Sequence, residues 1–167
     1  DFEPRLLPGW NVPDGNDSFA DECSNHGTHV TGILAAEGDN NRGVSGVDWR
    51  CSILPVVVVD GCTGVESWVA EGIVWAVDNG ADIINMSLQY TVGTTVLADA
   101  VAYAEAAGVV QIAAAGNSGD LDDVRAPARF PETIAVAATD NRDRRWSGSS
   151  GGPEVDVVAP GWSIYSC

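Results

Sequence analysis

The chain has 167 residues, of which 45% are hydrophobic, so it is long and apolar enough for one packed domain with a sizeable core. Its formal net charge is -16, with eight arginines and no lysine. Nucleic-acid binding needs a basic face for phosphate contacts, so we expect no nucleic-acid partner. The longest apolar run, 53–59, contains Pro55 and is too short to cross a membrane, so we expect no membrane association either.

The first half of the chain is expected to hold two helices with one strand between them. Residues 1–23 are rich in proline and glycine and predict no long element. Apolar residues at helical spacing follow the second histidine and predict a helix that Gly38 closes. The β-branched run "SILPVVVV", 52–59, predicts a strand buried on both faces. A helical stripe then predicts a second helix over 65–80, which ends at an Asn-Gly pair.

The second half continues the alternation of strand and helix. A threonine cap at Thr94 and a glycine stop at Gly108 bound a third predicted helix. Four buried or short strands are predicted at 81–88, 109–116, 132–139 and 154–160. This order is typical of a doubly wound, mostly parallel α/β sheet with helices on both faces, in one domain over 1–167. Ligands of such sheets bind at the carboxyl ends of the strands, where three glycine-containing loops leave this sheet.

The cysteines are four in number, Cys23, Cys51, Cys62 and Cys167, and no two form a CxxC pair. A zinc ribbon or a thioredoxin-like motif is therefore excluded. Cys23 and Cys62 lie in polar, turn-rich segments, where surface disulfides form, whereas Cys51 precedes an apolar run and is expected to be a buried thiol.

Both histidines lie in "SNHGTHVTGILAA", and three interpretations of them stay open on the residues alone. His26 precedes the predicted helix, where the positive end of the helix dipole favours a neutral imidazole that can act as a general base. His26 and His29 also have a spacing that suits zinc, with Cys23 as a third ligand. Either histidine can also be purely structural. A general base would need a nucleophile and a carboxylate partner.

Two further stretches carry candidate chemistry. "AAAGNSG", 113–119, presents Asn117 after a buried strand, where an amide donor suits the stabilisation of an oxyanion, although a Gly-Asn turn after a strand is common in any protein. "GSSGG", 148–152, fits the pattern G-x-S-x-G around Ser150. A nucleophile elbow needs a helix after the serine, and Pro153 with a β-rich segment follows instead, so we do not expect Ser150 to be a nucleophile.

Four stretches carry a family resemblance. In order and spacing, "HGTHVTGILAA", "DIINMSL", "AAAGNSG" and "VDVVAPG" are similar to segments of the subtilisin-like serine peptidases, with some likeness to the proteinase K-like members. The resemblance covers nearly the whole chain. It implies the subtilisin-like α/β fold and, for the full-length protein, endopeptidase activity by a Ser/His/Asp triad with an asparagine oxyanion donor.

The resemblance also assigns roles residue by residue. His26 matches the general base, Asn117 the oxyanion donor and His29 a structural histidine. A polypeptide substrate is implied to bind as an added strand, and Gln89 stands where the family usually has glycine. The implied substrate contacts are Gly61, Gly64, Ser87, Leu88, Ala114, Ala115 and Gly116.

The triad is expected to be incomplete within 1–167. The family's aspartate belongs to a motif that would precede Asp1, and its nucleophilic serine to a "GTSMA"-like motif that would follow Cys167. We therefore expect a partial catalytic domain, truncated at both ends and inactive alone. The alternatives are a catalytically dead subtilase-like domain that serves in binding or as a scaffold, and a zinc hydrolase built on His26, His29 and Cys23.

Further expectations come from the same resemblance. It implies a disulfide between Cys23 and Cys62, a secreted monomer, and chemistry that requires no cofactor. A structural calcium site is implied near Pro131, Thr133 and Asp140, through backbone carbonyls and one carboxylate.

Overall fold

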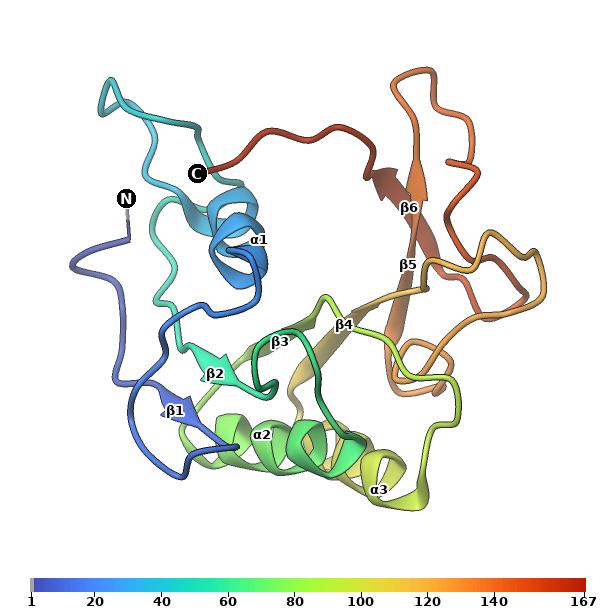
Figure 1. The fold of residues 1–167 in the computed structure, drawn as a ribbon, viewed down its shortest axis with the longest axis horizontal. Helices are drawn as coiled ribbons and strands as arrows, with labels where there is room; N and C mark the ends of the chain where they lie inside the picture. Colours follow the sequence, from blue (N-terminus) through green and yellow to red (C-terminus); the bar gives the residue numbers. More distant parts are fainter. Residues whose placement is uncertain (1) are drawn as a thin grey trace. The chain divides into compact units, whose positions relative to one another are not determined.

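The computed structural model describes residues 2–167, which divide into two compact units. The first unit extends to Trp68 and includes Tyr165–Cys167, and the second is Val69–Ile164. Figure 1 shows the order of the helices and strands along the chain. The single partial domain expected from the sequence is not tested by this division and stays a prediction.

The second unit is built on a parallel sheet of four strands, as expected for an α/β fold. Its strands stand in sequence order and all three neighbouring pairs are parallel. Met86 pairs with Ala113, so the carboxyl ends of the first two strands lie next to each other. The strands are β3 (Ile83–Met86), β4 (Val110–Ala114), β5 (Ile134–Thr139) and β6 (Val157–Pro160).

Helix α3 (Thr95–Ala106) connects β3 to β4 and packs against β4. Its buried face consists of Leu97, Ala100, Val101 and Ala104, as the helical spacing predicts, but Val96, which the same spacing places on this face, is 56% exposed. The side-chain amide of Gln111 in β4 is buried and donates a hydrogen bond to the carbonyl of Val101 at 2.9 Å. Gly108 follows the helix with a φ of 80°, which glycine adopts without steric cost, so the predicted stop is confirmed. Helix α2 is Glu66–Asp78, within the predicted 65–80.

The first unit holds helix α1 (His26–Ala35) and a two-stranded parallel sheet of β1 (Trp10–Asn11) and β2 (Val56–Val57). The long buried strand predicted over 52–59 is wrong, because only two residues form the strand and both are half-buried. Pro55 explains the shortening, since it has no N–H to donate to a strand ladder.

The end predicted for α1 at Gly38 is also wrong. The helix ends at Ala35, and Ala36 is extended with a ψ of 138°. A returning loop satisfies the last carbonyls of the helix: the N–H groups of Gly46, Val47 and Asp48 donate to the carbonyls of Ala36, Ile33 and Leu34. These bonds replace the glycine cap that the sequence suggested.

Two burial predictions are also wrong. Strand β3 is not fully buried, since it forms an edge of the four-stranded sheet and Ile83 is 61% exposed. Cys51 is only half-buried, because it lies in a surface turn where the Asp48 carboxylate accepts its N–H. Within residues 2–167, no helix has the length and apolarity that a membrane crossing requires.

Candidate active site

The histidine loop of the first unit places His26 at the start of a helix. His26 is the first residue of α1 and is exposed, and its N–H donates to the carbonyl of Cys23 at 2.9 Å. Ser24 and Asn25 make this tight turn possible with positive φ values of 52° and 61°. Asparagine is one of the few residues that tolerates this left-handed region.

A neighbouring carboxylate caps α1 in place of the usual N-cap side chain. Asn25 is the N-cap residue, but its left-handed conformation leaves it without a side-chain capping bond. Asp21 instead accepts the N–H of Thr28 at 2.7 Å and the Thr28 hydroxyl at 2.9 Å. Its other carboxylate oxygen accepts the N–H of Cys23 at 3.2 Å. Asp21 thus fixes both sides of the turn that carries His26.

The charge of Asp21 is stabilised by these contacts. Partial burial of the carboxylate works to raise its pKa, but the hydrogen bonds from Thr28 and Cys23 and the nearby His26 outweigh it and lower the pKa below the ordinary aspartate value. Asp21 is therefore an anion at neutral pH. Its position seven residues before Thr28 matches no standard capping pattern, so this role could not be predicted from the sequence.

Cys23 and Cys62 form a disulfide, the pairing that the resemblance implied. Cys62 lies in a tight turn closed by two hydrogen bonds between Asp60 and Thr63, at 2.8 and 3.0 Å. Gly61 in this turn has a φ of 57°, so glycine suits the position. The disulfide therefore holds the loop with Gly61 and Gly64 against the residues that precede His26.

In the second unit, the remaining predicted residues meet at the adjacent carboxyl ends of β3 and β4. Ser87 and Leu88 follow β3, and Ala115 and Gly116 follow β4 (Figure 1). Ala114 is the last residue of β4, and the N–H of Ala115 still donates to Val136 of β5 at 2.9 Å. The two segments proposed as opposite walls of a substrate site are thus neighbours in one sheet.

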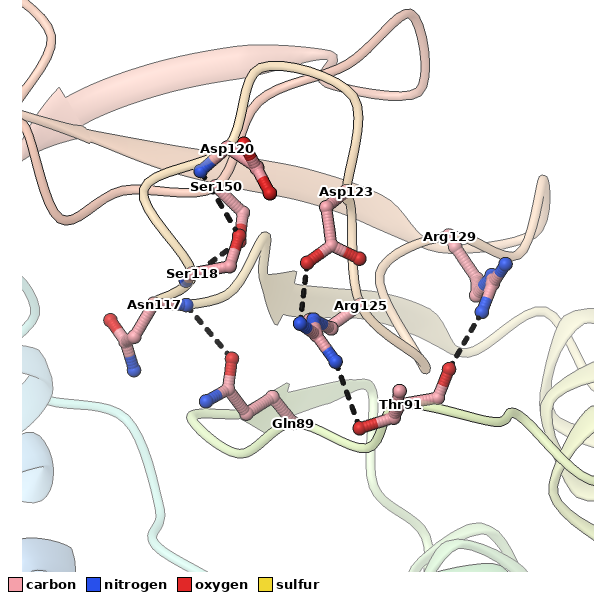
Figure 2. Close-up of polar contacts among 9 residues, drawn as sticks. All are labelled: Gln89, Thr91, Asn117, Ser118, Asp120, Asp123, Arg125, Arg129 and Ser150. Carbon is pink, nitrogen blue, oxygen red and sulfur yellow. Dashed lines mark hydrogen bonds and ion pairs between the residues drawn. The ribbon is translucent and has the colours of Figure 1, made fainter.

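Asn117 lies in the loop directly after this strand end. It is exposed, and Figure 2 shows its side-chain amide pointing away from the hydrogen bonds that hold the loop. Its backbone N–H donates to Oε1 of Gln89 at 2.8 Å. The side chain of Gln89 thereby links the segment after β3 to the loop after β4, a contact that the sequence did not reveal.

A pair of serine hydroxyls supports the same loop from the other side. Ser150 is fully buried, and its Oγ lies 2.8 Å from the Ser118 hydroxyl and accepts the Ser118 N–H at 3.2 Å (Figure 2). The Ser150 N–H donates to Gly116 at 2.9 Å. Among the described residues 151–167 no helix follows Ser150, and its hydroxyl is buried, which agrees with the expectation that Ser150 is not a nucleophile.

Comparison with known proteins identifies the family. Residues 5–167 match the family described as the subtilase family, peptidase S8. This chain belongs to the subtilase family. It is 44% identical to thermitase of Thermoactinomyces vulgaris over 99% of the chain and 59% of thermitase. It is 45% identical to subtilisin E of Bacillus subtilis (strain 168) over 93% of the chain and 41% of that protein.

Solved structures confirm the fold class. The crystal structure of a cold-adapted subtilisin-like serine proteinase matches 99% of this chain and 59% of its own, with a TM-score of 0.89 and 34% identity. A protease from Pseudoalteromonas arctica matches 96% of this subtilase chain with a TM-score of 0.87 and 31% identity. The chain therefore spans between about two fifths and three fifths of these relatives.

The alternative zinc site of His26, His29 and Cys23 lacks its third ligand in this subtilase. Cys23 is in the disulfide and offers no thiolate, and no group of three potential metal-ligating side chains occurs among the residues that the structure describes. The family match likewise favours the serine peptidase interpretation.

The residues implied for calcium do not fit the ion well. Both carboxylate oxygens of Asp140 already accept hydrogen bonds, from the backbone N–H groups of Arg142 and Arg144 and from the Arg144 guanidinium at 2.7 Å. These bonds, the Arg144 side chain first, lower the pKa of Asp140 and stabilise its charge without a metal. Thr133 has a buried hydroxyl with no partner, but Pro131 is exposed, and the calcium site stays a prediction.

Proposed function

We propose that the full-length protein containing this chain is a serine endopeptidase. The observation that carries the proposal is the match of residues 5–167 to the subtilase family. The position of His26 at the start of α1, in a loop fixed by a disulfide and by Asp21, supports its role as general base. The nucleophilic serine and the triad aspartate are proposed to come from outside 1–167.

The mechanism follows from the chemistry of these groups. The serine hydroxyl attacks the peptide carbonyl while His26 accepts its proton, and His26 then returns that proton to the leaving amine. The carbonyl oxygen becomes an oxyanion in the tetrahedral intermediate. The side-chain amide of Asn117, exposed at the carboxyl end of β4, donates a hydrogen bond to this oxyanion.

The substrate is proposed to be a polypeptide that binds as an added strand. Two short backbone segments would accept it, one at Ser87 and Leu88 and the other at Gly61 and Gly64. Main-chain hydrogen bonds to an added strand give affinity, and side-chain pockets give specificity. Ala114, Ala115 and Gly116 are proposed as the wall that faces Ser87 and Leu88.

The location proposed for the full-length protein is outside the cell. The Cys23–Cys62 disulfide supports this, because structural disulfides persist in oxidising compartments. A single subunit is proposed to be active, and the chemistry is proposed to require no cofactor. Structural calcium is proposed only through carbonyl oxygens near Pro131 and Thr133, without the Asp140 carboxylate, whose oxygens already accept hydrogen bonds from Arg142 and Arg144.

An inhibition experiment tests the proposal. The full-length protein, expressed with its flanking coding sequence, should cleave casein and lose activity with the serine reagent phenylmethylsulfonyl fluoride. A zinc-selective chelator should leave the activity unchanged. Cleavage that the chelator abolishes would favour the zinc hydrolase, and a folded protein without any cleavage would favour the dead, binding-only domain.

A further inference from the structure

The contacts around Gly116 point to a specificity determinant. We infer that Gln89 restricts the substrate residue before the scissile bond to small side chains, such as that of alanine. The inference rests on the proposed function, which makes Ser87–Leu88 and Ala114–Gly116 the two walls that receive this side chain. Beyond the proposed function, Gln89 closes the space between these walls, and substrates with a small residue at this position are preferred.

The side chain of Gln89 crosses from one wall to the other. It starts in the segment after β3, one residue beyond Leu88, and its Oε1 accepts the N–H of Asn117 at 2.8 Å in the loop after β4 (Figure 2). This hydrogen bond joins the two segments that would have to stay apart to hold a large side chain. A glycine at position 89 would have no side chain to form this bond, so the space between the two segments would stay open.

The surroundings of Gly116 are closely packed, and Gln89 is part of that packing. A Cβ atom placed on Gly116 would lie 2.8 Å from Oε1 of Gln89, 2.6 Å from Cγ of Arg125 and 2.7 Å from Oγ of Ser150. These distances are shorter than van der Waals contact. Gln89, Arg125 and Ser150 thus fill the space on the Cβ side of Gly116. Ser150 is buried within the fold, and Gln89 is the residue of the three that reaches this wall from the segment after β3.

Of these three residues, Gln89 is the one whose removal opens the space without breaking the fold. Ser150 is fully buried and supports the loop after β4. Arg125 is bound to the Asp123 carboxylate at 2.5 Å and to the Thr91 hydroxyl at 2.8 Å, so its guanidinium is held and its charge compensated. Gln89 is exposed and is held through its Oε1 by the Asn117 N–H.

The test compares two chromogenic tetrapeptide anilides that differ only in the last residue, alanine or phenylalanine. In the full-length protein, Gln89→Gly should raise kcat/KM for the phenylalanine peptide by about tenfold or more, the range for pockets that gain room for apolar groups. The alanine peptide should change by less than about threefold. Gln89→Glu keeps the length and the acceptor and should preserve the wild-type preference.

The matched control is Val92→Gly, which introduces glycine into the same loop at a side chain that is 71% exposed. It should leave the preference unchanged. An unaltered preference in Gln89→Gly, or an equal fall of kcat on both peptides, would overturn the inference. The equal fall would mean that Gln89 only positions Asn117. A wild-type protein that cleaves neither peptide nor casein would refute the proposed function and this inference with it.

Discussion

Asp21 accepts hydrogen bonds from both the N–H and the hydroxyl of Thr28, at 2.7 and 2.9 Å. It therefore caps the helix that begins at His26, although it lies outside the residues where a cap is ordinarily found. The same carboxylate binds the N–H of Cys23, one end of the disulfide. One side chain thus connects the helix start, the disulfide and the loop of the proposed general base.

Removal of this cap should destabilise the protein. Asp21→Ala leaves the Thr28 N–H without its acceptor, and we expect a loss of about 1 kcal/mol in the free energy of unfolding. Chemical denaturation of the full-length protein, blocked with a serine-peptidase inhibitor, measures the difference. Asp17→Ala, at an exposed position of the same loop, is the control and should change stability by less than about 0.5 kcal/mol. Equal stabilities of the two variants would contradict the capping role.

The contribution of Asp21 should depend on pH. Its folded-state pKa is lowered, so the unfolded chain takes up the proton first and the carboxylate stabilises the fold above the ordinary aspartate value of about 4. This stabilisation is lost as the pH falls from there through the folded-state pKa. The difference in unfolding free energy between wild type and Asp21→Asn should therefore shrink in acid. A difference that grows below about pH 4 would refute the assignment.

The disulfide should contribute more to the free energy of unfolding than the Asp21 cap does. Cys23 and Cys62 are 39 residues apart in sequence, and a crosslink over such a loop stabilises by up to about 4 kcal/mol through the unfolded state. The double variant Cys23→Ser/Cys62→Ser should lower the melting temperature clearly, whereas Cys51→Ser, at a free cysteine, should change it little. A non-reduced digest analysed by mass spectrometry should contain one linked pair of peptides with Cys23 and Cys62. Free thiols at both positions would contradict the pairing.

If Asn117 is the oxyanion donor, its removal should lower turnover rather than substrate binding. Asn117→Ala in the full-length protein should lower kcat by about 10²- to 10³-fold with little change in KM. This magnitude is the one known for removal of such a donor in a subtilisin, a relative of this chain. Asn141→Ala, at an exposed asparagine of the same unit, should keep the wild-type kcat. Wild-type turnover of Asn117→Ala would remove that residue from the mechanism.

The elements that the sequence predicted best are those with a strong local pattern. Helix α3 has a buried apolar stripe, from which only the predicted Val96 is missing, and the glycine stop at Gly108. Thr94 is at the predicted N-cap position, but its side chain makes no capping hydrogen bond. The strands β4 and β5 follow from apolar β-branched and alanine-rich runs between turn residues. The parallel order then follows from the alternation of strand and helix.

The predictions that failed depend on partners far away in the sequence. The end of α1 at Ala35 is set by donors at 46–48, and the exposure of Ile83 by the edge position of β3. The local sequence pattern therefore predicts neither the end of α1 nor the exposure of Ile83. The two contacts that shape the candidate site most were not predicted either. Asp21 accepts the Thr28 N–H and Gln89 accepts the Asn117 N–H, and each bond joins two separate turns, whether their residues are near or far apart in sequence.

The central claim is that His26 is the general base of a serine endopeptidase, and its most direct test is kcat of the full-length protein with and without that imidazole. The wild type should cleave a chromogenic peptide, and His26→Ala should lower kcat by about 10⁶-fold, the loss known for removal of the base in a subtilisin. KM should change little, because the imidazole acts on the transferred proton rather than on substrate binding. His29→Gln, at the half-buried histidine one turn further along α1, should retain most of the activity. A wild-type kcat in His26→Ala would contradict the account.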